Sequence, residues 1–157
     1  MKNFNSKLIG LLVSAALFTN VAYAADETFN ASIRILAALK ITEQSALKFP
    51  DTEAASVAKT VTVASTNSGA ATFNITGEGN STVTASIVES GVTMSNNGTD
   101  ITVGGFTFGG KLGPNGVGTL DSTGKLNGAA VGATANIPAN PSAGNYSGTL
   151  TFRVVYN

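Results

Sequence analysis

The sequence predicts an all-β protein folded as an antiparallel β-sandwich, and three observations lead to this prediction. Apolar and polar residues alternate with a period of two in several short runs, as they do in strands with one buried face. Clusters of Gly, Asn, Asp and Ser separate these runs roughly every 10 to 20 residues, which leaves no room for a long amphipathic helix. Charged residues are sparse, at 11% of the chain, while small and β-branched residues are abundant.

The first 24 residues have the pattern of a secretory signal peptide. Lys2 and Lys7 precede an apolar run over residues 8–18, and the Ala-Tyr-Ala sequence at 22–24 provides small residues before the predicted cleavage point. The apolar run is shorter than the roughly 20 residues that a membrane-spanning helix needs. We therefore exclude residues 1–24 from the folded domain and expect the rest of the chain to be exported.

The remainder of the chain has the size of one ordinary domain. Removal of 24 of the 157 residues leaves 133, with seven basic and nine acidic residues and a net charge of −2. Such a chain has no electrostatic attraction to nucleic acid. It contains no Cys, so its stability must come from packing and strand pairing rather than from disulfides.

Three runs fit the strand pattern best because β-branched or aromatic residues alternate with polar ones. They are KTVTVAS at 59–65, ATFNITG at 71–77 and STVTASIV at 81–88. Turn signals separate the runs along the chain, at 67–69, 77–80, 95–100, 113–116 and 121–124.

A fourth run, DITVGGFTFGG at 100–110, changes its phase. Its apolar residues move from odd to even positions across Gly104-Gly105, which predicts a β-bulge there. In the region before Phe49 we predict strands around residues 31–42, followed by a short irregular connection. The glycine-rich part from 104 to 132 is expected to hold the longer loops.

The run AGNYSGTLTFRVVYN at 143–157 has the longest regular alternation. One face carries Tyr146, Gly148, Leu150, Phe152, Val154 and Tyr156, and the other carries mainly Ser, Thr and Arg. This pattern predicts a strand from Tyr146 to Tyr156 with one face buried.

The types of residue present restrict the chemistry. The chain contains no His, Cys or Trp, so the usual catalytic triads, thiolate nucleophiles and zinc sites cannot be assembled. We predict no catalytic residue, no cofactor and no metal site. Pairs of carboxylates stay open as an alternative, among Glu78, Glu89, Asp100 and Asp121.

The C-terminal run resembles the subunits of bacterial chaperone–usher fimbriae, and among them the cysteine-free pilins and related exported pilin-like domains. In that family an aromatic residue is next to last, and a Gly lies fourteen residues from the end. Here Tyr156 is penultimate and Gly144 is the fourteenth residue counted back from Asn157. The Ala-Gly-Asn-Tyr sequence at 143–146 matches an opening that is common before this strand in pilins.

The resemblance implies an immunoglobulin-like antiparallel sandwich that lacks its seventh strand. The gap leaves an apolar groove beside the C-terminal strand, where a periplasmic chaperone first lends a strand and the next subunit then replaces it. The implied partners are this chaperone, an outer-membrane usher and other copies of the chain in a fimbria at the cell surface, which supports adhesion or biofilm formation. Six residues are expected to border the groove and contact the chaperone: Gly144, Tyr146, Leu150, Phe152, Val154 and Tyr156.

The donor strand is expected at residues 25–36, with the sequence ADETFNASIRIL. Alternation places Phe29, Ala31, Ile33 and Ile35 on one face. This donor segment runs into the first strand of a pilin-like sandwich domain over 37–157.

Two other interpretations remain open. In the first, residues 27–36 and 145–156 are ordinary strands of a self-complemented secreted or surface sandwich, which binds a glycan or a host protein as a monomer. In the second, the chain is a small secreted hydrolase that uses a pair of carboxylates.

Overall fold

The computed structural model describes residues 24–157. All but the last residue of the predicted signal peptide lie outside this range. Two units are distinguished, with a boundary between Ile33 and Arg34. The described part of the first unit, residues 24–33, forms no helix or strand, and all its residues are exposed. The second unit, Arg34–Asn157, contains all the described strands.

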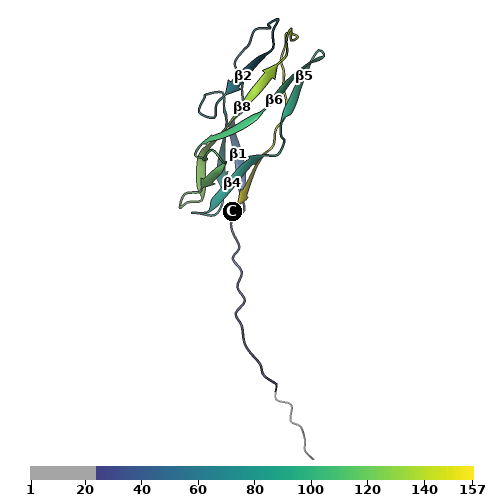
Figure 1. Cartoon of the computed structure of the whole chain (residues 1–157). Helices are drawn as coiled ribbons and strands as arrows, with labels where there is room; N and C mark the ends of the chain where they lie inside the picture. Colours follow the sequence, from purple (N-terminus) through teal and green to yellow (C-terminus); the bar gives the residue numbers. More distant parts are fainter. Residues whose placement is uncertain (1–23) are drawn as a thin grey trace, which may run out of the picture. The chain divides into compact units, whose positions relative to one another are not determined.

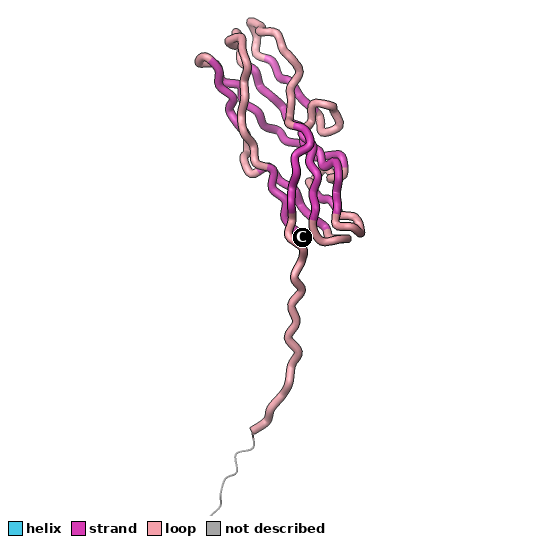
Figure 2. Tube along the Cα trace, turned by 180° about the vertical axis from the view of Figure 1, so that it is seen from behind, coloured by secondary structure: helices cyan, strands magenta, loops and turns pink. Residues whose placement is uncertain are grey.

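The second unit is built from antiparallel strands. Figure 2 shows strands and loops only, and no helix occurs among residues 24–157, so no described segment is a helix able to span a membrane. The strands are β1 (Lys40–Ser45), β2 (Lys59–Val63), β3 (Ala71–Thr76), β4 (Thr82–Ile87), β5 (Val92–Asn96), β6 (Thr99–Gly110), β7 (Val117–Thr119), β8 (Lys125–Ile137) and β9 (Phe152–Tyr156).

Two sheets make a sandwich, as the sequence predicts (Figure 1). The larger sheet has the order β1-β3-β8-β6-β5, with β2 also paired to β8, and the smaller sheet has the order β7-β4-β9. In an immunoglobulin-like sandwich, strands A-B-E-D form one sheet and C-F-G the other. Strands β1-β3-β8-β6 correspond to the first set and β4-β9 to C-F, and no described strand takes the place of G beside β9.

Several predicted elements are confirmed. The three best strand predictions correspond to β2, β3 and β4. The predicted bulge in β6 is present as a register shift between Gly104 and Thr107 against β8. Gly105 has a φ of +60° there, a left-handed conformation that favours glycine over residues with a Cβ atom.

The expectation of longer loops between 104 and 132 is wrong over its first and last parts, since β6 continues to Gly110 and β8 begins at Lys125. Residues 125–137 form β8, the strand that pairs with β2, β3 and β6. Its small residues allow close packing: a Cβ atom on Gly132 would overlap the Val63 carbonyl oxygen. Ala129, Ala130 and Val131 in succession are buried, so the middle of β8 is covered on both faces and shows no period of two there.

Two strand boundaries also differ from the prediction, because strands need partners. The predicted strand around 31–42 begins only at Lys40, since Lys40 already pairs with Thr76, the last residue of β3. The predicted strand from Tyr146 forms only over Phe152–Tyr156, since its partner β4 ends at Ile87. Residues 145–151 keep the alternating sequence but form no ladder.

The interior is divided into two apolar clusters. The closed half is the cluster between the two sheets, formed by Ile75, Val83, Ala85, Leu112, Leu120, Leu126 and Ala129. The open half is the cluster on the rest of the larger sheet, formed by Ile101, Val103, Ala133, Ala135 and Ile137. The open half borders a groove, which is described next.

Candidate functional site

A groove of about 750 Å³ with an apolar floor lies over the open half. Its floor is the inner face of the larger sheet, with Val61 of β2, Met94 of β5, Ile101 and Val103 of β6, and Ala135 of β8. Each of these strands places every second side chain on this face. The floor is therefore a continuation of the sandwich core without opposing strands.

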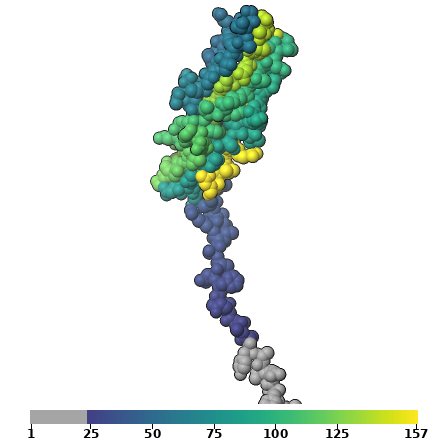
Figure 3. Space-filling view, in the orientation of Figure 1, coloured from purple at the N-terminus to yellow at the C-terminus, as the bar shows by residue number. Residues whose placement is uncertain are grey.

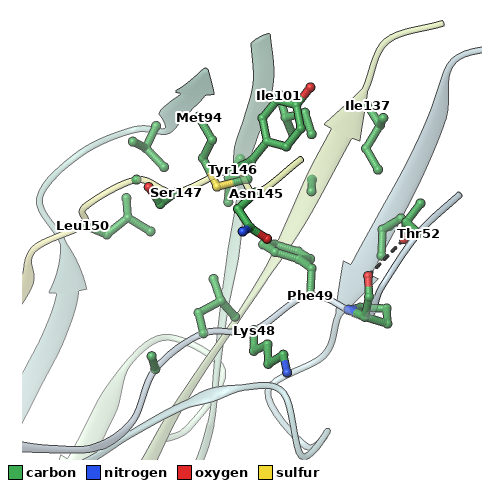
Figure 4. A pocket seen from close by; sticks show the side chains of 18 of the residues that line it. Lys48, Phe49, Thr52, Met94, Ile101, Ile137, Asn145, Tyr146, Ser147 and Leu150 are labelled. Carbon is green, nitrogen blue, oxygen red and sulfur yellow. Dashed lines mark hydrogen bonds between the residues drawn. The ribbon is translucent and has the colours of Figure 1, made fainter. Parts of the chain in front are cut away.

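Two irregular segments form the walls of the groove. One wall is residues 46–54 and the other is residues 141–150, followed by Phe152. Figure 4 shows Phe49 of the first wall and Tyr146 and Leu150 of the second around the same space. Because both walls contribute apolar side chains, a strand lying between them would contact apolar surface on both sides.

Glycine lets the second wall lie close to the floor. A Cβ atom on Gly148 would be 2.9 Å from Cγ2 of Val92 and 3.1 Å from Cγ of Met94. Tyr146 packs against the open half, and its hydroxyl donates a hydrogen bond to the Ser142 carbonyl oxygen (2.8 Å).

The backbone of both walls has unused hydrogen-bonding groups. Among the described residues, 144–150 make no backbone–backbone hydrogen bond, and in 46–54 one is seen, from Lys48 N–H to the Gly69 carbonyl (2.8 Å). Buried backbone groups are nearly always paired. A ligand covering these walls must therefore supply hydrogen-bond donors and acceptors, as a β-strand does.

Strand β9 is the open edge of the smaller sheet, and the C-terminal residues lie on the surface (Figure 3). The Val88 N–H donates to the Thr151 carbonyl, and the Asn157 N–H donates to the Thr82 carbonyl. Because neighbouring residues of a strand direct their backbone groups to opposite sides, those of Phe152, Val154 and Tyr156 face the open edge. Strand β1 is likewise an edge strand, paired only to β3 in the described part of the chain.

The predicted groove residues fall into two groups. Gly144, Tyr146, Leu150 and Phe152 line the groove. Val154 and Tyr156 instead pack against the closed half, beyond the groove. Phe152 joins the two regions, since its ring stacks on Phe73 with centroids 4.2 Å apart and planes 7° apart.

Tyr156 holds the segment that leads into β1. Its hydroxyl accepts a hydrogen bond from the Glu78 N–H (2.6 Å) and donates one to the Ala37 carbonyl (2.7 Å). The Glu78 carboxylate accepts bonds from the Ala37 N–H (3.2 Å) and from Arg34 (3.0 Å). These bonds, the one from Ala37 above all, hold the pKa of Glu78 below its usual range.

The predicted donor residues are on the surface of the chain. Phe29 is 89% exposed, Ile33 88% and Ile35 85%, and Ala31 is also exposed. None of them lies in a strand. Phe29, Ile33 and Ile35 are thus large apolar side chains that lie outside the core, with the small Ala31 at the position between the first two.

The other candidate carboxylates hold local structure. Glu89 accepts bonds from the N–H and the hydroxyl of Thr151, both 2.7 Å, and these bonds lower its pKa. Asp121 closes its turn by accepting from Thr123, and its pKa is lowered by that hydroxyl first. Asp100 accepts a hydrogen bond from a serine hydroxyl of β5. Each of these groups thus fixes a turn or a strand end.

Sequence reasoning missed the floor of the groove and its first wall. Leu47 and Phe49 lie in a stretch without strand periodicity, so only their apolar character marked them. The floor depends on which strands pair with β8, and that pairing is set by contacts far apart in the sequence.

A family model described as Domain of unknown function (DUF4402) matches residues 49–156. The chain belongs to this family. The DUF4402 match contains the floor of the groove, the second wall and most of the first wall, while β1 and residues 24–39 precede it. No curated protein and no solved structure matches the chain.

Proposed function

We propose that this chain is a structural subunit of a bacterial surface fimbria, which polymerises when residues 25–36 of one copy enter the groove of the next. The observation that carries the proposal is the groove itself: an apolar floor between two walls with unpaired backbone groups. Such a site fits an extended peptide with alternating apolar side chains. Residues 25–36 have that pattern and are exposed.

The lengths of donor and groove agree. At roughly 3.3 Å per residue, residues 25–36 reach about 40 Å when extended, and so do residues 144–156 beside the open edge. A donor strand of this length therefore suffices to pair with β9 and with the part of the second wall that starts at Gly144.

The expected contact is strong enough for a fibre. Burial of Phe29, Ile33 and Ile35 would contribute about 1.5–3 kcal/mol for each side chain. New backbone hydrogen bonds would add about 0.5–1.5 kcal/mol each. Because donor and acceptor surfaces differ, the assembly is head to tail and stays open at both ends.

An open groove on a free subunit is an aggregation hazard, because edge strands pair with any extended chain. We therefore propose that a periplasmic chaperone lends a strand to the groove after export and that an outer-membrane usher delivers the subunit to the cell surface. The protein's role in this scheme is structural, in support of adhesion or biofilm formation, with no catalytic step and no cofactor.

The experiment is to express the full chain with Phe29→Asp in cells that contain the assembly machinery, and to image fimbriae by electron microscopy. A carboxylate at this donor position would have to be buried in an apolar groove, so we expect subunits bound to chaperone but no fibres. The matched control is Asn30→Asp, which adds the same charge on the polar face and should leave fibres intact.

Fibres of normal length from the Phe29→Asp variant would refute the donor assignment. If the unmodified chain is a stable monomer in every condition, the self-complemented sandwich that binds a glycan or a host protein becomes the better account.

A further inference from the structure

One acidic side chain lies on the inner face of β1, at the end of the groove. Glu43 lines the groove and pairs across the strands with Phe73, whose ring stacks on Phe152. Its neighbour on the same face, Ile41, pairs with the fully buried Ile75. Glu43 thus lies on the side of β1 that faces the groove, while remaining exposed because β1 is an edge strand.

Glu43 is exposed, and none of residues 24–157 donates a hydrogen bond to its carboxylate. No described side chain forms an ion pair with it, and the salt bridge of the described region joins Arg34 to Glu78. A strand that fills the groove would displace water from this carboxylate. Removing an unpaired carboxylate from water is costly, so the occupant must leave it access to solvent.

We propose that Glu43 sets the register of the incoming strand by requiring a small side chain beside it, and that this side chain is Ala31 of a second copy. The inference rests on the proposed function, because it concerns the same groove and the same donor segment. A small side chain leaves space for water around the carboxylate, whereas Phe or Ile would enclose it.

Only one register places a small residue from the middle of the donor segment beside Glu43. The donor face carries Phe29, Ala31, Ile33 and Ile35, and a shift by two residues would bring Phe29 or Ile33 to Glu43. With Ala31 in place, the bulky donor residues on both sides of it meet apolar surface.

The sequence of the donor also favours one direction. If the donor runs antiparallel to β9, Ile33 and Ile35 enter the deep groove, and Phe29 lies on Ile41, which is 36% exposed. If it runs the other way, Glu27 enters the apolar groove instead. The cost of burying that second carboxylate selects the antiparallel direction.

Cysteine pairs test the register without changing Glu43 or Ala31. The chain has no natural Cys, so each introduced pair is unique. In the proposed register, Asn30 of the donor lies beside Thr42 on the outer side of β1, within disulfide distance. We expect the Asn30→Cys, Thr42→Cys chain to give disulfide-linked ladders on boiled, non-reducing gels. The matched control, Ser32→Cys with Thr42→Cys, should give several-fold less.

Equal cross-linking of the two pairs, or preferential cross-linking from position 32, would overturn the register. Cross-linking that vanishes after Phe29→Asp is added would show that the ladders arise from donor insertion.

A binding experiment tests the role of Glu43 itself. The acceptor is the full chain from Ala25 with Phe29→Asp, so that its own segment does not compete, and the probe is a labelled synthetic peptide of residues 25–36. We expect a peptide with Ala31→Leu to bind about tenfold more weakly than the native peptide, a difference of about 1.4 kcal/mol. With Glu43→Ala in the acceptor this penalty should disappear, whereas Glu53→Ala, a second acid lining the groove, should leave it unchanged.

A penalty that is the same with and without Glu43 would refute its role in register while leaving the proposed function in place. Absence of binding by the native peptide would overturn the donor assignment and, with it, the register.

Discussion

The closed and open halves of the sandwich use the same large sheet but differ in what covers it. In the closed half, Ile75 and Leu126 of the large sheet, with exposures of 0% and 3%, pack against Val83 of β4. In the open half, Ile101 and Ile137 of the same sheet are 7% and 9% exposed and border the groove. The two halves therefore differ in whether the smaller sheet covers them, and not in the apolar character of the large sheet.

Strand lengths explain why one half stays open. Strands β6 and β8 have 12 and 13 residues, whereas β4 and β9 have 6 and 5. The large sheet therefore extends beyond the ladder that opposes it. In the proposed function, another copy of the chain covers the part of the large sheet that extends beyond this ladder.

The largest effect expected from a single core substitution is in the closed half. Ile75→Ala should lower the free energy of unfolding by about 2–5 kcal/mol, because it leaves a cavity in a packed interior. Ile101→Ala should cost less, about 1–2.5 kcal/mol, since the groove already lies beside it and the loss is mainly one of transfer from water. Chemical denaturation of both variants measures the difference, and equal costs would contradict the division into two halves.

Backbone protection provides a second test. Amide protons of residues 145–150 should exchange rapidly in the free subunit, because these residues lack backbone hydrogen bonds. Addition of the 25–36 peptide should slow their exchange by about tenfold or more, while the amides of β4 change little. Protection of residues 145–150 already present without the peptide would show that the open half is closed in solution.

Removing a tyrosine hydroxyl from each half should give smaller changes in the free energy of unfolding. Tyr156→Phe removes two hydrogen bonds to backbone groups at the closed end and should cost about 1–2 kcal/mol. Tyr146→Phe removes one bond beside the groove and should cost about half as much. Thermal unfolding measures both, and a larger effect at Tyr146 would reverse the comparison.

The smallest expected effect is a dependence on pH. Hydrogen bonds from Thr151 lower the pKa of Glu89 in the folded state, so its contribution to stability is present at neutral pH and is lost as the pH falls below about 4. Glu89→Gln should therefore flatten part of the decline of unfolding free energy in acid. An unchanged pH profile in this variant would show that the contact with Thr151 is not formed in solution.

The sequence was sufficient for strands β2, β3 and β4 but not for β8 and β9. Strands β2, β3 and β4 have clear alternation of apolar and polar residues. Strand β8 was missed because its middle is buried on both faces, and its Ala and Gly residues have the composition of a loop. The length of β9 was overestimated because alternation shows which residues face inward but not whether a partner strand is present.

The prediction of the site is limited because alternation does not show which strand lies beside each residue. Tyr146, Leu150 and Phe152 were found from alternation, and they do line the groove. Val154 and Tyr156 continue that alternation but pack against the closed half, since β4 runs beside them. No pattern in the sequence distinguished Glu43 from the other acidic residues. Its place beside the groove became visible only from its pairing with Phe73.

In the proposed assembly, residues 25–36 of one copy complete the open half of another. The most direct measurement is the size of the chain starting at Ala25, compared with the same chain lacking residues 25–31, by size-exclusion chromatography and unboiled SDS gels. The account predicts SDS-resistant ladders or fibres from the longer chain, and from the shorter chain a monomer or a subunit that needs a chaperone to stay soluble. Two stable monomers with the same cooperative melting would contradict it.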